Sequence, residues 1–327
     1  MERKKQVVVV GDAVVDLVVH LPKVKGQQKI LDPLPYITGG GTGANTAVAL
    51  SRLGIPTSFI GSLGKDSYGE FVLNDLVREG VDISQVQVRS EAKTVGVFAF
   101  IDEDGERFLW GWPRENQAFK VLEYQAVSSE VLKNASWLHT TGMALCHPGS
   151  GRQAIRQLVK DASELKVPIS FDLNLRLRDG VLPTEFKEVI LEMIEQASYV
   201  FGSATDEWAY LGSGSWQETA ISFATTERGI VARSSQGSTL FMGETVFHPS
   251  FKIPVKDTIG AGDASSAGLI AGLLWQRDRL DVLRMGNGVA AYKICQGGPR
   301  SLPTLPELKS FMASHRTRTK ENVRDIT

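Results

Sequence analysis

Asp257-Thr258-Ile259-Gly260-Ala261-Gly262-Asp263 separates a strand-like segment at 253–255 from a run of small apolar residues at 264–274. The apolar run predicts a closely packed helix, so the two glycines are expected at a helix N-terminus. Free N–H groups and the positive end of the helix dipole favour an anion there. Asp263 adds a carboxylate suited to a general base. An ordinary glycine-rich turn is the alternative, but an aspartate at each end and the following helix favour phosphoryl transfer.

A second glycine-rich segment, Gly39-Gly40-Gly41-Thr42-Gly43-Ala44-Asn45, also precedes a predicted helix, at 45–53. Glycines lack a Cβ and let a ligand approach the backbone closely, and the Asn45 amide offers both donors and an acceptor. A small molecule with several hydroxyl groups needs that mixture. Because Asn is also a good N-cap residue, a flexible loop before a capped helix is the alternative.

Two carboxylates, Asp12 and Asp16, follow a predicted buried strand at 7–10. Ligands of parallel sheets bind beyond the carboxyl ends of the strands, where these carboxylates can accept hydrogen bonds from adjacent sugar hydroxyls. Metal binding and solvated turn residues are the competing interpretations, the second above all for Asp12.

Alternating polar residues follow the predicted strand at 168–172. In extended backbone Asp172, Asn174 and Arg176 point the same way. Asn174 suits a polar ligand, and the Arg176 guanidinium suits a carboxylate or phosphate. A surface cluster of ion pairs is the alternative.

The composition indicates a globular protein with one large core. Of 327 residues, 42% are hydrophobic and 22% charged, and the formal net charge of −1 argues against a nucleic-acid partner. Cys146 and Cys295 have no ligand-like spacing, so a reduced, cytoplasmic protein without structural zinc is expected. The apolar run at 7–10 is too short for a signal peptide, and no segment has the length of a transmembrane helix, so no membrane association is expected.

From residue 136 onward, short apolar segments alternate with amphipathic ones, which is typical of an α/β fold with a mostly parallel sheet covered by helices on both faces. The predicted strands in this part are 137–140, 168–172, 198–201, 220–224, 229–233 and 239–242. The predicted helices are 149–165, 184–196, 206–211, 263–275, 279–293 and 305–313.

The first third of the chain has a different pattern. A strand at 57–60 and a helix at 70–79 are predicted between broken, extended pieces that together favour a small separate sheet. Asp102-Glu103-Asp104-Gly105 predicts a hairpin turn in that sheet. The polar segment 316–327 lacks periodicity and is predicted to be a flexible tail.

These segments together resemble the ribokinase (PfkB) family of carbohydrate kinases over nearly the whole chain. Asp257 to Asp263 is similar to the second signature of the family, and Gly40 to Asn45 resembles the first. Residues 11–16, 61–69 and 80–82 fit the intervening segments. The resemblance implies a three-layer α/β/α kinase domain at 1–315 with a small β-sheet lid formed by segments of about 17–37 and 94–115. It also implies a homodimer formed through the lid.

The resemblance implies an ATP-dependent transfer to a primary hydroxyl of a sugar or sugar acid, fructose-like or 2-keto-3-deoxygluconate-like. It assigns Asp263 as the base and the N–H groups of Gly260, Ala261 and Gly262 as the anion hole. The implied substrate contacts are Asp12, Asp16, Gly40, Gly41, Asn45, Asn174 and Arg176. The implied ATP contacts are Thr226, Gly229, Thr258, Gly260, Gly262 and Asn287. The implied metal ligands are Asp206 and Glu207 for Mg²⁺, and Asp257 and Ser301 for a monovalent cation such as potassium.

Two segments depart from the family pattern. Ser203-Ala204-Thr205-Asp206 stands where the family has Asn-x-x-Glu, and Ala224-Thr225-Thr226 stands where Thr-x-Gly is expected. These departures keep open a sugar-binding or regulatory protein with impaired catalysis. A nucleoside kinase of the same family is a further alternative, for which Trp110 or Trp112 would supply a platform for the base.

Overall fold

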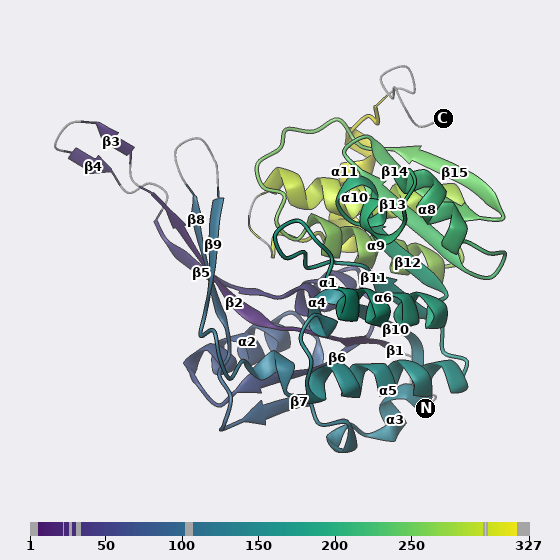
Figure 1. Ribbon diagram of the computed structural model, residues 1–327. Coiled ribbons are helices and arrows are strands. Elements are labelled where there is room, and N and C mark those ends of the chain that lie inside the picture. The colour runs from purple at the N-terminus through teal and green to yellow at the C-terminus, as the bar shows by residue number, and fades with distance from the viewer. Residues whose placement is uncertain are drawn as a thin grey trace.

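A large twisted sheet organises the fold, as the computed structural model of residues 6–21, 23–25, 28–30, 34–101, 107–296, 298 and 300–318 shows (Figure 1). The strand order is β15-β14-β13-β12-β11-β10-β1-β6-β7. All neighbours from β7 to β13 are parallel, whereas β13, β14 and β15 are antiparallel. The strands are β1 (Gln6–Val10), β6 (Thr57–Gly64), β7 (Asp82–Arg89), β10 (Ala135–Thr141), β11 (Ile169–Asp172), β12 (Tyr199–Ser203), β13 (Gly229–Ser234), β14 (Gly237–Met242) and β15 (Glu244–Pro249).

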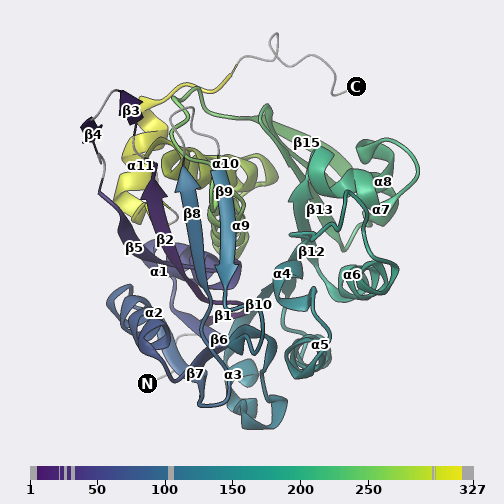
Figure 2. The same cartoon turned by 60° about the vertical axis from the view of Figure 1, so that its left-hand side comes forward.

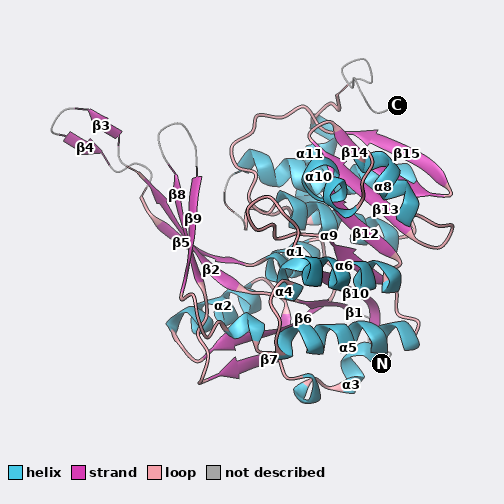
Figure 3. Cartoon of the chain, viewed as in Figure 1, coloured by secondary structure: helices cyan, strands magenta, loops and turns pink. Residues whose placement is uncertain are grey.

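Helices cover both faces of this sheet (Figure 3). They are α1 (Thr42–Arg52), α2 (Ser67–Arg78), α3 (Ser129–Lys133), α4 (Gly142–Leu145), α5 (Ser150–Glu164), α6 (Thr184–Gln196), α7 (Ala209–Leu211), α8 (Trp216–Phe223), α9 (Ala261–Leu274), α10 (Arg279–Gln296) and α11 (Leu305–Ser314). The predicted mostly parallel α/β sheet is therefore confirmed. No helix in the described ranges has the length and apolar character needed to cross a bilayer.

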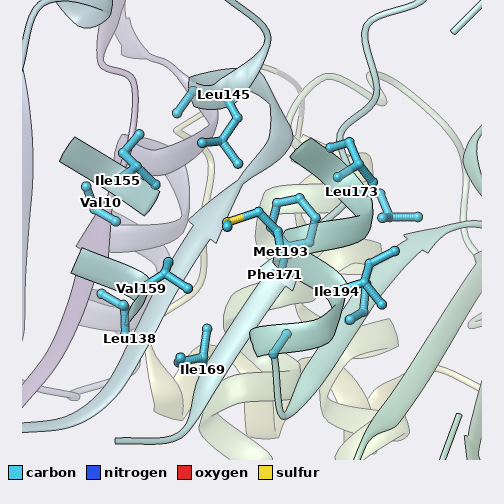
Figure 4. Packing of buried hydrophobic residues seen from close by; sticks show 14 of the residues in the cluster. Val10, Leu138, Leu145, Ile155, Val159, Ile169, Phe171, Leu173, Met193 and Ile194 are labelled. Atoms are coloured by element: carbon cyan, nitrogen blue, oxygen red, sulfur yellow. The ribbon is translucent and has the colours of Figure 1, made fainter. Parts of the chain in front are cut away.

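Alternation along β1 divides the interior into two cores. Val8 and Val10 point into one cluster with residues of α5 and α6, whereas Val7 and Val9 point into the other with residues of α1, α2, α9 and α10. Figure 4 shows the first cluster, in which Val10 lies near Ile155 and Leu138 near Val159, both of α5. Because successive strand residues face opposite ways, an uninterrupted valine run is what a strand buried on both faces requires.

A second, smaller sheet extends away from the large one (Figure 2). Its order is β5-β2-β8-β9, formed by β2 (Val14–His20), β5 (Tyr36–Gly40), β8 (Gly96–Ile101) and β9 (Arg107–Trp112). The predicted small sheet is thus present, and β2 begins slightly before the expected segment. A separate ribbon pairs β3 (Lys23–Lys25) with β4 (Gln28–Ile30). The predicted turn at 102–105 lies outside the described residues, although β8 and β9 pair in antiparallel fashion.

Two predicted strands are wrong. Segment 220–224 belongs to α8, because Ser215 and Glu218 form a capping box that starts a helix there. Segment 253–255 forms no strand, since Pro254 has no N–H to donate, although Phe251 just before it forms an isolated bridge. The strand β15 was missed by the sequence pattern.

Two further boundaries differ from expectation. The helix predicted at 206–211 begins as a π-helical turn, Ala204–Trp208, and continues as α7. The start of the predicted flexible tail is paired: Lys252 N–H donates to Arg316 O (2.9 Å) and Arg318 N–H to Ser250 O (2.9 Å). The prediction is wrong for 316–318, and 319–327 lies outside the described residues.

The pair α9 and α10 depends on glycine for close approach. A Cβ added at Gly268 would lie 2.6 Å from Met285 O and 2.9 Å from Gly286 Cα. Real Cβ atoms do not come so near backbone atoms, so an added methyl group would push the helices apart.

Gly268→Ala is therefore expected to destabilise the protein by about 1–3 kcal/mol, although alanine is the better helix former. Chemical denaturation measures the difference. Gly111→Ala is the matched control, because a Cβ there would meet Val95 at an ordinary 3.7 Å. Equal stability of the two variants would contradict the close-approach argument.

Candidate active site

The carboxyl ends of the parallel strands meet the N-termini of α1 and α9. The pairing register aligns Thr141 with Asp172, and Ser203 with Arg233, at this edge of the sheet. Thr42 at the start of α1 shares a hydrogen bond with the Thr141 hydroxyl (2.8 Å). Arg233 reaches the first turn of α9, as described below. Segments from both ends of the sequence thus converge where ligands of parallel sheets bind.

Asp263 lies in the first turn of α9, and only 6% of its surface is exposed. Asn45 Nδ2 donates to Asp263 Oδ2 (2.8 Å). Burial raises the pKa of Asp263 to about 7, although the hydrogen bond from Asn45 favours the charged form. Asn45 Oδ1 is buried and has no donor among the described residues. The pair therefore offers a carboxylate that can take up a proton near neutral pH and an amide oxygen that can accept a hydrogen bond from a hydroxyl group.

The anion site precedes Asp263. Gly260 has φ 75°, a left-handed conformation that favours glycine, and α9 begins directly after it. Ala261 N–H donates to Thr258 O (3.1 Å), whereas no described residue accepts a hydrogen bond from the N–H groups of Gly260 and Gly262. Of the three N–H groups predicted to form an anion hole, two therefore have no acceptor among the described residues, and the turn itself uses the third.

Arg233 is a site residue that the sequence analysis missed. Its guanidinium bridges both Asp172 oxygens (2.7 and 3.0 Å), and Nη1 also donates to Gly262 O (2.9 Å) and Ser266 Oγ (3.0 Å). Burial raises the pKa of Asp172, but Arg233 outweighs it and holds that pKa below its usual value. An arginine at the end of a predicted strand was the available signal. The pairing with Asp172 was not visible, because the two are 61 positions apart.

The glycine-rich segment before α1 lies against Asp16. A Cβ at Gly40 would overlap the Asp16 carboxylate, and a Cβ at Gly41, whose φ is 94°, would lie 2.7 Å from Asp12 O. Burial raises the pKa of Asp16 to about 7, against the opposing attraction of Arg300. The predicted loop of glycines therefore brings the backbone next to a carboxylate that can exchange hydrogen bonds with hydroxyl groups.

Asp12 caps α1. Its carboxylate accepts from Thr42 Oγ1 (2.6 Å), Thr42 N–H (3.0 Å) and Gly43 N–H (3.3 Å). Such bonds satisfy the free N–H groups of a helix start. The buried Asp12 therefore holds the helix that carries Asn45, which is a positioning role more than the predicted substrate contact.

Arg300 contacts the backbone of the same glycine-rich segment. It is buried, and Nη1 donates to Ala44 O (2.8 Å) while Nε lies 3.4 Å from Asp75 Oδ2. A Cβ at Gly39 would overlap both Asp75 and Arg300. Asp75 belongs to α2 and Arg300 to the segment after α10, so no pattern along the chain predicted that the two would be in contact.

Asn174 and Arg176 follow β11, but the extended backbone that would point them the same way as Asp172 does not continue beyond the strand, so that prediction is wrong. Asn174 has φ 35°, an unusual conformation for a residue other than glycine. Arg176 is exposed; Nη1 donates to Leu175 O (3.2 Å) and Nε lies 3.0 Å from Met143 Sδ. Met143 lies two positions after Thr141, whose hydroxyl bonds Thr42 at the start of α1, so the guanidinium lies beside the same edge of the sheet. Arg176 forms no ion pair with a described residue.

The candidate Mg²⁺ ligands differ in their surroundings. Glu207 accepts from Ser203 N–H (2.6 Å) and Leu175 N–H (2.9 Å), and burial raises its pKa. Both of its oxygens hold backbone, which fits a structural role better than direct metal binding. Asp206 is exposed and bonded only to neighbouring hydroxyls. Mg²⁺ is usually bound by one or two carboxylates together with substrate phosphates. Of the two candidates, Asp206 fits this role better than Glu207, because its carboxylate is exposed to a Mg²⁺ ion that is bound to ATP.

The predicted ATP contacts are divided between the two edges of the sheet. Gly229 pairs with Tyr199 at the amino end of β13, and Thr226 precedes it, whereas Arg233 at the carboxyl end reaches α9. Thr226 and Gly229 therefore lie at the wrong edge to contact a nucleotide beside Gly262.

Thr258 and Asn287 remain near the expected edge. Thr258 is exposed in the loop before Gly260. Asn287 of α10 is buried; it accepts from Ser238 Oγ (2.6 Å) and donates to His248 O (2.9 Å). Ser238 lies at the start of β14, paired with Arg233. Asn287 thus fixes the two hairpin strands against α10 at the edge where the nucleotide is predicted.

One of the two candidate monovalent-cation residues, Asp257, contacts a cationic side chain of the protein. Lys293 Nζ donates to Asp257 O (2.9 Å) and lies 3.4 Å from Asp257 Oδ2. Gly298 N–H donates to the same carboxylate (2.7 Å), and Ser301 N–H donates to Gly298 O (3.4 Å). Hydrogen bonds through Gly298 therefore link Asp257 and Ser301, and the ammonium group of Lys293 lies beside Asp257.

Comparison with known proteins gives a consistent family. Residues 4–306 match the model of the pfkB family carbohydrate kinases. An ATP-dependent ribose-1-phosphate kinase of Halopiger xanaduensis is 28% identical, over 90% of this chain and 92% of the relative. A 5-dehydro-2-deoxygluconokinase of Clostridium botulinum is 27% identical, over 84% and 83%. An E. coli protein described as ribokinase II, solved with ATP and Mg²⁺, superposes with a TM-score of 0.82 at 23% identity, over 95% of this chain and 100% of that one.

The raised pKa of Asp263 predicts a pH-dependent stability difference. At pH values between 3.8, the ordinary pKa of an aspartate, and about 7, the folded protein holds a proton on Asp263 that the unfolded chain releases. This contribution to stability is present at low pH and is lost as the pH rises through about 7. Asp263→Asn removes the buried charge, so its melting temperature relative to wild type should rise between about pH 5 and about pH 8. A difference that stays constant with pH would contradict the assignment.

Proposed function

The chain belongs to the pfkB family of carbohydrate kinases, and from this premise we propose that it transfers the γ-phosphoryl group of ATP to a primary hydroxyl of a sugar acid or sugar. The observation that carries the proposal is the buried Asn45–Asp263 pair directly beside the N-terminus of α9. Phosphoryl transfer requires an acceptor for the alcohol proton next to a site for the developing phosphate charge. These two requirements meet here within one helix turn.

Asp263 accepts the proton of the attacking hydroxyl. A raised pKa near 7 makes it a stronger base than an ordinary carboxylate, while a large part remains ionised at neutral pH. Asn45 Nδ2 orients the carboxylate by donating to Asp263 Oδ2. The free Asn45 Oδ1 accepts a hydrogen bond from a second hydroxyl of the substrate. The acceptor oxygen is thereby held in line for attack.

The N–H groups of Gly260 and Gly262 and the positive end of the α9 dipole stabilise charge on the transferred group. Arg233 holds Gly262 O and thus fixes the orientation of this turn. Mg²⁺ bound with ATP supplies neutralisation of the phosphate charge. Because these groups are in place before the substrate binds, little reorganisation is needed at the moment of transfer.

An anionic substrate suits the rim of the site. Arg176 is exposed and lacks an acidic partner among the described residues, and its Nε lies 3.0 Å from Met143 Sδ, two positions after the carboxyl end of β10. A guanidinium binds a carboxylate or phosphate through two parallel hydrogen bonds. The names of the two relatives above specify a sugar phosphate and a sugar acid. Both support a substrate with a negative charge.

The alternative of a nucleoside kinase loses its main support. Trp110 pairs with Phe98, which pairs with Leu17, whereas Asp16 pairs with Val97. Neighbouring positions in a strand face opposite ways, so the tryptophans lie on the face of the small sheet opposite Asp16. The departure at Thr226 also loses its weight as a sign of impaired catalysis, because Thr226 lies at the other edge of the large sheet.

A panel of sugars, sugar acids, sugar phosphates and nucleosides with ATP, read out as ADP formation, tests the function. We expect turnover with an anionic sugar, and a loss of at least about 10²-fold in kcat for Asp263→Asn with substrate binding retained, as expected when a general base is removed. Arg176→Met should raise KM for the anionic substrate more than it lowers kcat. Wild-type turnover by Asp263→Asn would overturn the assignment of the base.

We further propose that the chain forms a dimer through the aromatic face of the small sheet. Phe98 and Trp110 (5.6 Å between ring centroids), Phe100 and Phe108 (6.3 Å), and Trp112 form a continuous row. Phe108 and Trp112 are 65% and 53% exposed. A contiguous apolar patch of this kind marks an interaction surface, and a second copy would cover it by the symmetric contact usual in homodimers.

Phe108→Arg is expected to convert this dimer to a monomer, because it places a charge in the centre of the apolar contact. Light scattering after size-exclusion chromatography measures the mass. Val77→Arg is the control, since Val77 of α2 is 57% exposed on a different surface. A monomeric wild-type protein, or equal behaviour of both variants, would refute the interface.

A further inference from the structure

Lys293 is a lysine with no exposed surface. It lies on α10, in the half that packs near the Asp257 loop, and its relative exposure is 0%. Lysine is almost never fully buried unless its charge is paired, because removing an ammonium group from water costs several kcal/mol. A lysine in this position therefore indicates a specific electrostatic function.

Two oxygens of Asp257 lie close to the Lys293 ammonium group. Nζ contacts the Asp257 carbonyl (2.9 Å) and the Asp257 carboxylate (3.4 Å). A carboxylate and a carbonyl oxygen are also the ligands that a hard cation prefers in proteins. An ammonium group of the chain thus uses the type of oxygen set that a monovalent metal ion would use.

The residue that Lys293 holds controls the shape of the anion site. Asp257 Oδ1 accepts from Ile259 N–H (2.8 Å), and Oδ2 accepts from Gly298 N–H (2.7 Å). Ile259 leads directly into Gly260, whose left-handed conformation starts α9. The ammonium, the carboxylate and the turn therefore form one connected unit, and a shift of Asp257 would move the N–H groups that face the phosphate.

A second cation does not fit beside this ammonium. Two like charges that contact the same carboxylate repel each other strongly at the effective dielectric of a protein site, and one carboxylate carries the charge to neutralise only one of them. The potassium site expected at Asp257 and Ser301 is therefore incompatible with the observed position of Lys293 Nζ.

We propose that the Lys293 ammonium is a built-in replacement for an exchangeable monovalent cation, which fixes the Asp257 loop and makes turnover independent of potassium. The inference rests on the proposed phosphoryl transfer for its effect on rate. Its effect on cation binding is independent of that function.

The first test compares wild-type protein in potassium, sodium and tetramethylammonium chloride at matched ionic strength. We expect turnover rates equal within about twofold, since ionic strength and not ion identity is what general screening depends on. The melting temperature should not depend on the choice of cation. Stimulation by potassium together with a rise in melting temperature would overturn the proposal.

The second test removes the charge in two ways. Lys293→Ala leaves a space beside the Asp257 oxygens, so the kcat of this variant should fall at least about tenfold. Potassium or ammonium ions should restore its activity and its melting temperature, whereas tetramethylammonium should not. Lys293→Met fills the space without a charge, so the loss should persist in every salt. Lys256→Ala, an exposed lysine in the same loop, is the control.

The outcomes separate the two proposals. Two results with a folded Lys293→Ala protein would overturn the proposal that Lys293 replaces a cation. One is full turnover without added cation. The other is an inactive protein whose activity and melting temperature do not respond to potassium or ammonium. If neither variant folds, the wild-type comparison decides. If the wild-type protein phosphorylates no member of the substrate panel, the proposed function fails, while melting temperatures in the different salts still decide the cation inference.

Discussion

The hydrogen bond from Asn45 to Asp263 is the contact on which the site depends. It joins the first turns of α1 and α9 across 218 positions of sequence. Each helix start lies at the end of a glycine-rich segment, so the contact brings the substrate loop and the anion loop to a single point. A second link, from Thr46 Oγ1 to Asp263 O (3.5 Å), connects the same turns. If the helices moved apart, the base would lose the group that orients it and the site would lose its shape.

Buried cations surround this contact, and each holds a different backbone segment. Arg233 fixes the turn at Gly262, Arg300 contacts Ala44 O beneath the substrate loop, and Lys293 holds Asp257 before the anion loop. Loops rich in glycine cost conformational entropy to order, so fixed charge-assisted hydrogen bonds are an effective means of holding them.

Much of the fold could be predicted from the pattern of apolar residues. The valine run of β1 and the alternation after residue 136 predicted a parallel sheet buried on both faces, which the two core clusters confirm. The failures have local causes. The apolar residues of α8 suited a strand equally well, and only the Ser215–Glu218 capping box decided for a helix. The segment at 316–318 looked unstructured because its hydrogen bonds are made with Ser250 and Lys252, far away in sequence.

The sequence by itself determined the two glycine-rich loops and the places of Asp263 and Asn45 in the first turns of α9 and α1, because these depend on residue types next to a helix start. Only the tertiary structure decided which charges accompany them. Arg233 meets Asp172, Arg300 meets Asp75, and Lys293 meets Asp257 through side chains that cross between distant elements. Long, flexible cationic side chains can reach in many directions, and burial leaves only the arrangement in which each charge is paired. That arrangement is a property of the packed molecule and has no pattern along the chain.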